Sequence, residues 1–273
     1  MLTRPIPSTG EQLPVIGIGT WQGFDIGRGA ERTARREVLA ALFEAGGTVI
    51  DTSPMYGRAE AVVGEELPET PGHERAFVAT KVWTHGLRGG IRQMNDSMRL
   101  LGVDTIDLMQ IHNLVDWRTQ LETLRAWQDE GRIRYVGITH YTTSAFDDLE
   151  DVMRGEALDF VQLPYSIGVT GAAERLLPLA ADRGIAVMVN RPFDGGGLFA
   201  SVRGEALPDW ARETGCASWG QYFLEFILAH PAVTCVIPGT GNPDNARAAV
   251  VAGSGRLPEE AEARRMCEFW QRL

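Results

Sequence analysis

The sequence lacks a run of about 18 consecutive apolar residues, the length that a membrane-spanning helix requires. Its start, MLTRPIPSTGEQLP, has no hydrophobic signal core, and we expect a mature N-terminus. Cysteine is scarce: Cys216, Cys235 and Cys267 are odd in number and have no CxxC spacing. This pattern argues against a disulfide framework and favours a reducing compartment. We therefore expect a cytoplasmic protein with no membrane partner.

An excess of positive charge is also absent. The 273 residues carry a formal net charge of −10, which argues against a nucleic-acid partner but still permits a local basic pocket for a phosphate. The five histidines lie far apart, without acidic or thiol neighbours at ligand spacing, so we expect no metal site. The sequence also has no long apolar surface stripe, so it does not predict an oligomeric state. The expected partner is therefore a small molecule.

Lysine is the scarcest charged residue. Of the 26 basic residues, Lys81 is the single lysine and all others are arginines. The arginine excess is typical of the codon usage of a GC-rich genome, but codon usage does not explain why one lysine was kept. A site that needs a compact ammonium group instead of a planar guanidinium explains it.

Short β-branched runs alternate with amphipathic stretches along the whole chain, and no low-complexity linker divides them. The predicted strands are Val15–Ile18, Thr48–Asp51, Phe77–Lys81, Ile106–Ile111, Tyr135–Thr139, Phe160–Leu163, Ile185–Asn190 and Val233–Ile237. The predicted helices include Ala34–Glu44, Ala59–Leu67, Gly89–Leu101, Trp117–Glu130 and Ser144–Arg154. Eight strand–helix repeats predict an α/β fold, a closed (β/α)8 TIM barrel, in a single domain that covers residues 1–273.

Two segments depart from this repeat. The stretch RPIPSTGEQLP has a turn-forming Ser-Thr-Gly between two short extended pieces, and it predicts a small β-hairpin that caps the base of the barrel. The segment Gly195–Cys216 is longer than a plain strand-to-helix connection. Long loops of this kind usually work at a functional site.

Four ionisable residues fall at or just after the ends of three successive predicted strands. Asp51 ends the second strand, Lys81 ends the third, His112 follows the fourth, and Tyr56 lies in the loop after Asp51. Because the carboxyl ends of barrel strands converge on the active-site face, we expect these side chains to meet at one mouth. Each residue alone has an ordinary structural explanation, such as a turn former or a core side chain. The combination, which includes the single lysine, predicts an active site.

The four residue types together suit one kind of chemistry. A free tyrosine, with a pKa near 10, is too weak an acid to protonate an alkoxide efficiently at neutral pH. A neighbouring ammonium group stabilises the phenolate and is expected to lower that pKa, and an aspartate holds the lysine in place. A histidine then orients a carbonyl oxygen. The set contains no nucleophile and no hydride source, so it requires an external reductant.

In the stretches DTSPMYG, VATKVW and LMQIHN, these four residues resemble the catalytic tetrad of the aldo-keto reductase family. The resemblance continues in LPVIGIGTWQ, GRIRYVGITHY, VQLPYS and VTCVIPGTGNP, so it covers nearly the whole chain. It implies a (β/α)8 barrel with an N-terminal hairpin over its base. It also implies reduction of an aldehyde or ketone with a nicotinamide cofactor, NADPH in preference to NADH, bound across the barrel mouth without a Rossmann domain.

The resemblance assigns a role to individual residues. Tyr56 would be the general acid that protonates the substrate oxygen. Lys81 and Asp51 would tune its pKa, and His112 would orient the carbonyl. The implied cofactor-binding residues are Gly19, Thr20, Trp21, Asp51, Thr139, His140, Gln162, Asn190, Arg191, Pro192, Phe193, Gly239, Thr240, Asn242 and Asn245. The implied substrate-binding residues are Trp21, Trp83, His112 and Asn113.

The sequence departs from the family pattern after the fifth and seventh strands. GITH replaces the common GVSN, so Thr139 and His140 stand where a Ser-Asn pair binds the carboxamide. VNRPF replaces AYSPL, so Asn190 stands where a tyrosine stacks on the nicotinamide. Phe193 is a candidate for the missing ring, and Arg191 is a candidate for the pyrophosphate.

A further departure lies after the eighth strand. Asn245 aligns with an arginine that grips the 2′-phosphate in many relatives, and Ala248 and Ala249 align with a Glu-Asn pair that contacts adenine. Arg247 lies two positions beyond Asn245. These differences leave two other functions open: a cofactor-binding sensor or regulatory subunit with negligible turnover, and a non-redox lyase or isomerase.

Overall fold

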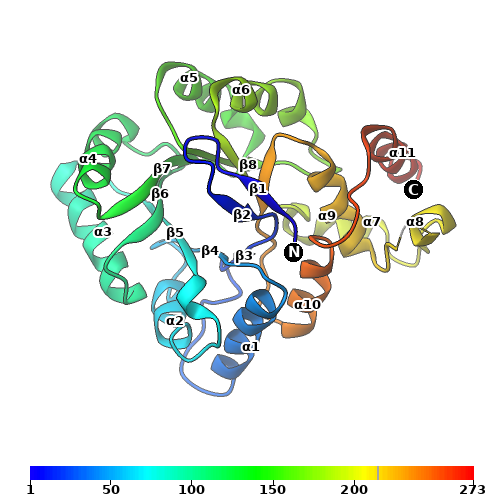
Figure 1. Cartoon of the computed structure of the whole chain (residues 1–273), viewed down its shortest axis with the longest axis horizontal. Coiled ribbons are helices and arrows are strands. Elements are labelled where there is room, and N and C mark those ends of the chain that lie inside the picture. The colour runs from blue at the N-terminus through cyan, green and yellow to red at the C-terminus, as the bar shows by residue number, and fades with distance from the viewer. Residues whose placement is uncertain (214) are drawn as a thin grey trace.

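One parallel sheet organises the computed structural model, which describes residues 1–213 and 215–273. Within these residues the sheet has eight strands, each hydrogen-bonded to its neighbour in the chain, in the order β3 to β10 (Figure 1). The strands are β3 (Ile18–Gly19), β4 (Val49–Asp51), β5 (Phe77–Val82), β6 (Ile106–His112), β7 (Ile133–Thr139), β8 (Phe160–Pro164), β9 (Ala186–Asn190) and β10 (Val233–Val236). The prediction of eight parallel strands is therefore confirmed.

The sheet is curled, and its two edges approach each other. Isolated parallel bridges pair Ile16 with Val236 and Gly19 with Gly239. The Gly17 N–H donates to the carbonyl of Val236 at 2.9 Å. The predicted strand Val15–Ile18 therefore contributes mainly through these bridges, and β3 itself is only two residues long.

Helices surround the sheet, as the alternating sequence pattern predicts (Figure 1). They are α1 (Glu31–Glu44), α2 (Ala59–Glu66), α3 (Leu87–Leu101), α4 (Trp117–Asp129), α5 (Phe146–Gly155), α6 (Leu176–Arg183), α7 (Gly197–Ser201), α8 (Asp209–Glu213), α9 (Trp219–Ala229), α10 (Pro243–Val251) and α11 (Glu260–Trp270). The predicted segment Gly195–Cys216 is not a plain loop, because it contains α7 and α8.

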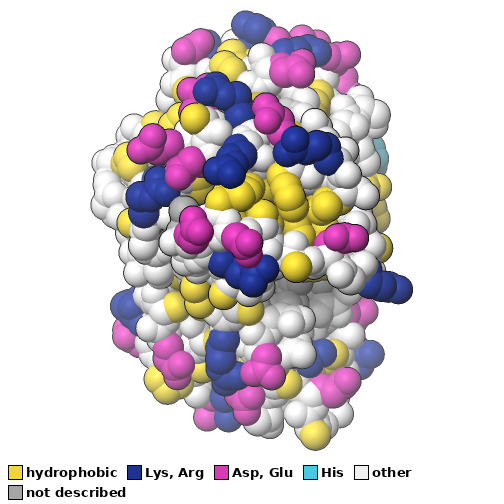
Figure 2. All heavy atoms as spheres, turned by 90° about the vertical axis from the view of Figure 1, so that its right-hand side faces the viewer, with side chains coloured by type: hydrophobic (Ala, Val, Ile, Leu, Met, Phe, Trp, Pro, Cys, Tyr) yellow, Lys and Arg dark blue, Asp and Glu magenta, His cyan; other side chains and the backbone are white. Residues whose placement is uncertain are grey.

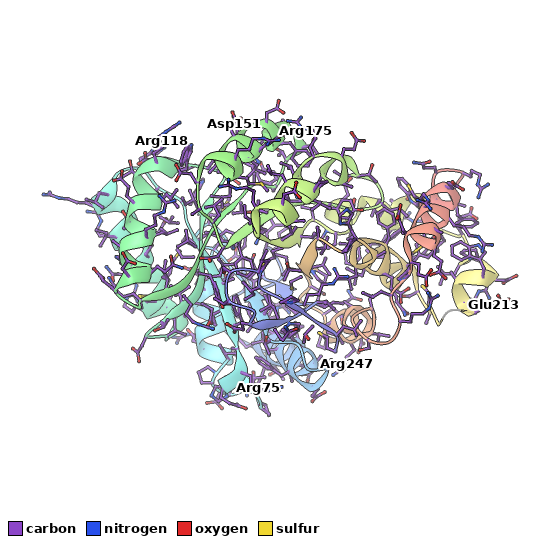
Figure 3. The ribbon with its side chains drawn as sticks, turned by 45° about the horizontal axis from the view of Figure 1, so that its top comes forward. Arg75, Arg118, Asp151, Arg175, Glu213 and Arg247 are labelled. Atoms are coloured by element: carbon purple, nitrogen blue, oxygen red, sulfur yellow. The ribbon has the colours of Figure 1, made fainter. Side chains whose placement is uncertain are left out.

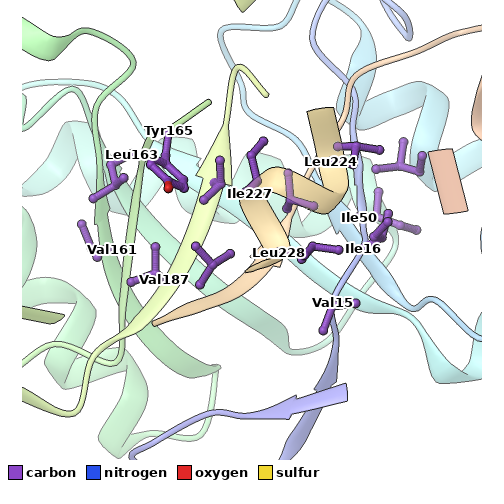
Figure 4. Close-up of a cluster of buried hydrophobic side chains, with 14 of the residues drawn as sticks. Val15, Ile16, Ile50, Val161, Leu163, Tyr165, Val187, Leu224, Ile227 and Leu228 are labelled. Carbon is purple, nitrogen blue, oxygen red and sulfur yellow. The ribbon is translucent and has the colours of Figure 1, made fainter. Parts of the chain in front are cut away.

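The main core lies between the sheet and the helices. Figure 4 shows Leu224, Ile227 and Leu228 of α9 among side chains of the strands, such as Val187, and all of them are buried. A second cluster fills the interior of the curled sheet, where Phe77, Tyr135 and Phe160 contact one another. Burial on both faces explains why the strands have nearly continuous apolar sequences.

The C-terminal part of the chain is attached by aromatic contacts. Phe269 of α11 packs against Trp210 and Trp219, with ring centroids 6.2 and 6.4 Å apart. The Tyr222 hydroxyl donates to the carbonyl of Met266 at 2.9 Å. The face that carries these helices shows hydrophobic side chains between groups of both charge signs (Figure 2). Other charged side chains lie around the outer helices, with Arg118 on α4, Asp151 on α5 and Arg175 at the N-cap of α6 (Figure 3).

The predicted N-terminal hairpin is present, formed by β1 (Thr3–Pro5) and β2 (Gln12–Pro14). Its residues Ile6 and Leu13 belong to the interior cluster, beside residues at the amino-terminal ends of the strands. The hairpin therefore lies at the end of the sheet opposite the predicted active site. No helix among the described residues is long and apolar enough to cross a membrane.

Arg4 fixes the hairpin to the sheet. Its guanidinium donates to the carbonyls of Leu228 at 2.6 Å and His230 at 2.9 Å, and also to that of Val233. We predict that Arg4→Ala lowers the free energy of unfolding by about 2 kcal/mol or more, because three partly buried carbonyls lose a charged donor.

Urea unfolding followed by circular dichroism measures this difference. Arg154→Ala is the matched control, because Arg154 forms only an exposed pair with Glu150 and should cost less than about 0.5 kcal/mol. Equal losses in the two variants would show that Arg4 does not anchor the hairpin.

Candidate active site

The structure brings the four predicted catalytic residues together at the carboxyl ends of β4, β5 and β6. The Lys81 Nζ lies 2.6 Å from the Asp51 Oδ2 and 4.9 Å from the centroid of the Tyr56 ring. The Tyr56 and His112 rings meet edge to face, with centroids 5.9 Å apart and planes at 89°. This convergence follows from the parallel sheet, since all its strands end on the same side.

The ion pair of Lys81 and Asp51 is buried, with exposed fractions of 0% and 2%. The Lys81 Nζ also donates to the Thr52 carbonyl at 2.8 Å. The Asp51 Oδ1 accepts from the Nε2 atoms of Gln110 at 3.1 Å and Gln162 at 2.9 Å. Both charges therefore have several hydrogen-bond partners, as buried ions require.

The charge of Lys81 is stabilised where it lies. Burial lowers the pKa of Lys81, but the attraction of Asp51 and Tyr56 outweighs burial and the net pKa is raised above its usual value. Lys81 is therefore an ammonium ion at neutral pH. A lysine in this state cannot form a Schiff base readily, but it places a fixed positive charge beside the phenol.

The pKa of Tyr56 differs from the expectation. Burial raises it and is the largest effect, Lys81 lowers it through charge and a hydrogen bond, and Asp51 raises it. Lys81 thus acts in the predicted direction, but the predicted net lowering is wrong, because desolvation of the phenolate exceeds the attraction of the ammonium group. At neutral pH Tyr56 is a protonated phenol and a hydrogen-bond donor.

His112 is a neutral imidazole. Burial, followed by the charges of Lys81 and His140, lowers its pKa from 6.5 to about 2. The Ser53 Oγ lies 3.0 Å from the Nδ1 of His112. A neutral ring that is bound on one nitrogen presents its other nitrogen to a substrate in a defined way.

Two predicted substrate-pocket residues are exposed at this end of the sheet, as ligand-lining groups should be. Trp21 is 52% exposed and Trp83 is 42% exposed. The Trp83 ring centroid lies 6.4 Å from that of His112. Asn113 follows His112 with a φ of 53°, and its N–H donates to the Thr139 carbonyl at 2.8 Å.

Several predicted cofactor-binding residues form one network with the ion pair. The Oε1 of Gln162 accepts from the Thr139 Oγ1 at 3.1 Å and from the Asn190 Nδ2 at 3.3 Å. The same Nδ2 of Asn190 contacts the His140 carbonyl at 3.1 Å. Gln162 bridges this group to Asp51. The structure thus joins four predicted cofactor residues to the predicted catalytic residues.

The ends of β3 and β10 lie beside each other. Gly19 bridges Gly239, and both the N–H and the Oγ1 of Thr20 donate to the Asp51 carbonyl at 3.0 Å. Asn242 is the N-cap of α10, and its side chain accepts a hydrogen bond from the Asp244 N–H. The backbone N–H of Asn242 donates to the Thr240 Oγ1 at 3.0 Å.

Asn245 is not brought into this cluster. It is exposed on α10, and no described contact joins it to the four catalytic candidates. Arg247 lies on the same helix (Figure 3). It pairs with Asp244, with the Arg247 Nη1 and the Asp244 Oδ1 2.8 Å apart.

The segment after β9 has an irregular backbone. Arg191 has a φ of 49° and pairs with Asp194 at 3.1 Å. Pro192 is buried. The Phe193 ring packs on Phe199, with centroids 4.9 Å apart, which places it in an aromatic cluster with α7.

The sequence prediction did not include Ser53, Gln110 and Tyr141. Gln110 lies two residues before His112 on β6, so strand periodicity could have placed both on the same side. Ser53 lies two residues after Asp51, but its contact with His112 has no sequence signal. Tyr141 is 48% exposed, stacks on His140 and lies 6.0 Å from the Arg191 guanidinium.

Comparisons with known proteins place the chain among similar sequences of one family. A family model described as the aldo/keto reductase family matches residues 15–266. The aldo-keto reductase YhdN of Bacillus subtilis is 29% identical over 67% of this chain, which covers 60% of that protein. The methylglyoxal reductase YeaE of Escherichia coli is 29% identical over 82% of this chain and 80% of its own length.

Another curated relative and a solved structure extend the comparison. The NADH-specific methylglyoxal reductase of Escherichia coli is 28% identical over 76% of this chain and 72% of its own length. An aldo/keto reductase from Klebsiella pneumoniae, solved with NADP and acetate, aligns with a TM-score of 0.81 and 23% identity. That alignment covers 96% of this chain and 93% of the other, and it shows a shared fold.

The low pKa of His112 predicts a pH-dependent stability. Below pH 6.5 the unfolded chain binds a proton at this position, while the folded chain does so only near pH 2, so the folded state loses stability as the pH falls. We predict that the free energy of unfolding of the wild type falls faster with decreasing pH than that of His112→Asn, by up to about 1.4 kcal/mol per pH unit.

Urea unfolding at pH 7, 5.5 and 4.5 gives the slope of the free energy of unfolding against pH for each protein. Subtracting the slope of His112→Asn from that of the wild type removes the contribution of the carboxylates. Parallel slopes would mean that His112 takes up a proton in the folded protein.

Proposed function

The chain belongs to the aldo/keto reductase family, and from this premise we propose that it is an NAD(P)H-dependent oxidoreductase that reduces an aldehyde or ketone to an alcohol. One observation carries the proposal. The buried ion pair of Lys81 and Asp51 lies next to the face of the protonated Tyr56 ring, and the neutral His112 ring is perpendicular to the Tyr56 ring. This arrangement provides donors for a carbonyl oxygen and contains no nucleophile.

Tyr56 is the proposed proton donor. A reduced nicotinamide, when bound, supplies the hydride that the carbonyl carbon accepts. As negative charge develops on the carbonyl oxygen, the Tyr56 hydroxyl transfers its proton to that oxygen and becomes a phenolate. The fixed charge of Lys81 stabilises the phenolate, and Asp51 keeps Lys81 charged and in place.

The residues at the mouth fit a nicotinamide cofactor. Among the described residues the buried Oδ1 of Asn190 has no hydrogen-bond partner, and it offers an acceptor for a carboxamide N–H. The loops at Gly23 and Gly241 come so close that a Cβ on Gly241 would lie 2.8 Å from the Gly23 carbonyl. The Arg35 guanidinium donates to the carbonyls of both glycines, at 2.6 and 3.0 Å, and so places a cation beside this part of the rim. We propose that the nicotinamide lies beside Asn190 and Gln162, with Thr139 and His140 at its edge.

Finer features are part of the same proposal. The bridges between the two sheet edges support closure into a (β/α)8 barrel. The three unpaired cysteines support a cytoplasmic location. The methylglyoxal reductases among the relatives support a small carbonyl compound as the substrate, held between Trp21 and Trp83.

We predict that Tyr56→Phe lowers kcat for aldehyde reduction by about 10²- to 10⁴-fold, because the substrate oxygen loses its proton donor. The Kd for the cofactor, followed by quenching of tryptophan fluorescence, should stay within about twofold. Tyr165→Phe is the matched control, since this buried tyrosine also loses only a hydroxyl, on a ring packed against Phe226 and His230.

The same assays separate the alternative functions. An undiminished kcat in Tyr56→Phe would exclude Tyr56 as the general acid. A wild-type protein that binds the cofactor but turns over no carbonyl compound would be a sensor. Turnover of a substrate without any cofactor would identify a lyase or isomerase.

We propose NADPH as the favoured cofactor, supported by the structural neighbour solved with NADP, and expect its advantage over NADH to be small. The reason is that Asn245 offers an amide where a cation would grip the 2′-phosphate, and Arg247 is engaged by Asp244. We predict that Asn245→Arg tightens NADPH binding by about tenfold or more and leaves the Kd for NADH unchanged.

Fluorescence titration of the wild type, Asn245→Arg and the neutral control Asn245→Gln is carried out with NADPH and with NADH. For each variant and each cofactor, the Kd is compared with that of the wild type. If arginine strengthens NADH binding as much as NADPH binding, position 245 does not face the 2′-phosphate.

A further inference from the structure

The side chain of Ser53 is hydrogen-bonded to the Nδ1 of His112. Ser53 lies in the loop after β4, two residues beyond Asp51, and is fully buried. Its Oγ lies 3.0 Å from the Nδ1 of His112 and accepts a hydrogen bond from the Met55 N–H at 3.3 Å. The hydroxyl thus stands between a backbone donor and an imidazole nitrogen.

The direction of this hydrogen bond follows from the other partners. A neutral imidazole carries its proton on one nitrogen and accepts on the other. If Nδ1 carried the proton, Ser53 would accept it, and the serine's own proton would have no acceptor among the described residues. If the Ser53 hydroxyl donates to Nδ1, the Met55 N–H, the Ser53 hydroxyl and the His112 Nδ1 each have a hydrogen-bond partner. The second arrangement is therefore favoured.

This direction determines what His112 presents to a substrate. With Nδ1 accepting from Ser53, the single proton of the ring is on Nε2. The ring lies edge to face with Tyr56 and near the ring of Trp83. In the proposed site, Nε2–H and the Tyr56 hydroxyl would both donate to one carbonyl oxygen. Two donors aimed at the oxygen on which charge develops stabilise the transition state more than the ground state.

We propose that Ser53 is a positioning residue, which fixes His112 in the tautomer that carries its proton on Nε2 and so completes a two-donor site for the carbonyl oxygen. The inference rests on the proposed carbonyl reduction. It goes beyond that function because it assigns the state of His112 to a residue that contacts neither substrate nor cofactor.

The tautomer is measured directly in the resting protein. Long-range ¹H–¹⁵N spectra of the ¹⁵N-histidine-labelled chain contain five imidazoles, and the set missing in His112→Asn identifies His112. The wild type is expected to show a protonated Nε2 and an unprotonated, hydrogen-bonded Nδ1. In Ser53→Ala both ¹⁵N resonances should shift toward a mixture of tautomers.

Turnover gives the second measurement. Ser53→Ala should lower kcat for aldehyde reduction by about tenfold to a hundredfold, with an unchanged Kd for NADPH. Ser53→Thr, which keeps the hydroxyl, should restore both the wild-type resonances and most of kcat. Ser97→Ala, a buried serine on α3, is the matched control and should change neither.

Three results would overturn the proposal: a wild-type His112 protonated on Nδ1, a Ser53→Ala protein with wild-type tautomer and kcat, or a loss of kcat without a change of tautomer. The first does not need the Ser53→Ala protein, so the proposal is testable even if Ser53→Ala folds poorly. A wild type with the expected tautomer but no carbonyl turnover would refute the proposed function and leave the role of Ser53 in setting the tautomer intact.

Discussion

The buried ion pair of Lys81 and Asp51 is the constraint on which the rest of the site depends. Removing both charges from water is costly, and their mutual attraction compensates only if the remaining donors and acceptors are satisfied. The carboxylate meets this condition by accepting from β5 on one oxygen and from glutamines of β6 and β8 on the other. One side chain of β4 is thus bound to three other strands. These contacts form because the sheet is curled, so that side chains from non-adjacent strands meet inside it, and the ion pair therefore depends on the fold.

The charge of Lys81 then sets the state of two neighbours in opposite ways. It opposes the effect of burial on Tyr56 and reinforces the effect of burial on His112. The result is a pair of neutral donors, a phenol and an imidazole, beside a cation that does not titrate near neutral pH. In the proposed mechanism a raised phenol pKa is a cost for proton transfer, but it would keep the proton on Tyr56 until the carbonyl oxygen becomes basic. The ammonium charge would have its largest effect after that transfer, when the phenolate remains behind, and catalysis requires such a difference between the two states.

The sequence was sufficient to predict the eight strands, the hairpin and the meeting of the four ionisable residues. Parallel strands buried on both faces have a strong apolar signal, and strand ends fix where Asp51, Lys81 and His112 point. The net pKa of Tyr56 was predicted in the wrong direction, because desolvation depends on how tightly neighbours pack and not on residue types. The pairing of Ile16 with Val236 and of Gly19 with Gly239 joins residues 220 positions apart, which no local sequence pattern predicts. The hydrogen bond between Ser53 and His112 depends on side-chain positions, which no spacing rule contains.

The single lysine of the chain is explained by the shape of its site. Lys81 has no solvent exposure, and its Nζ contacts one carboxylate oxygen, one carbonyl and the face of a phenol ring. An arginine here would carry five N–H donors in a rigid plane into a space with fewer oxygen acceptors than donors, so some buried donors would have no partner. A compact ammonium with three rotatable donors fits the same space. Surface positions place no such limit on a cation, because water satisfies whichever donors the protein does not. Codon usage is therefore free to select arginine on the surface, and only the geometry of this site preserves the lysine.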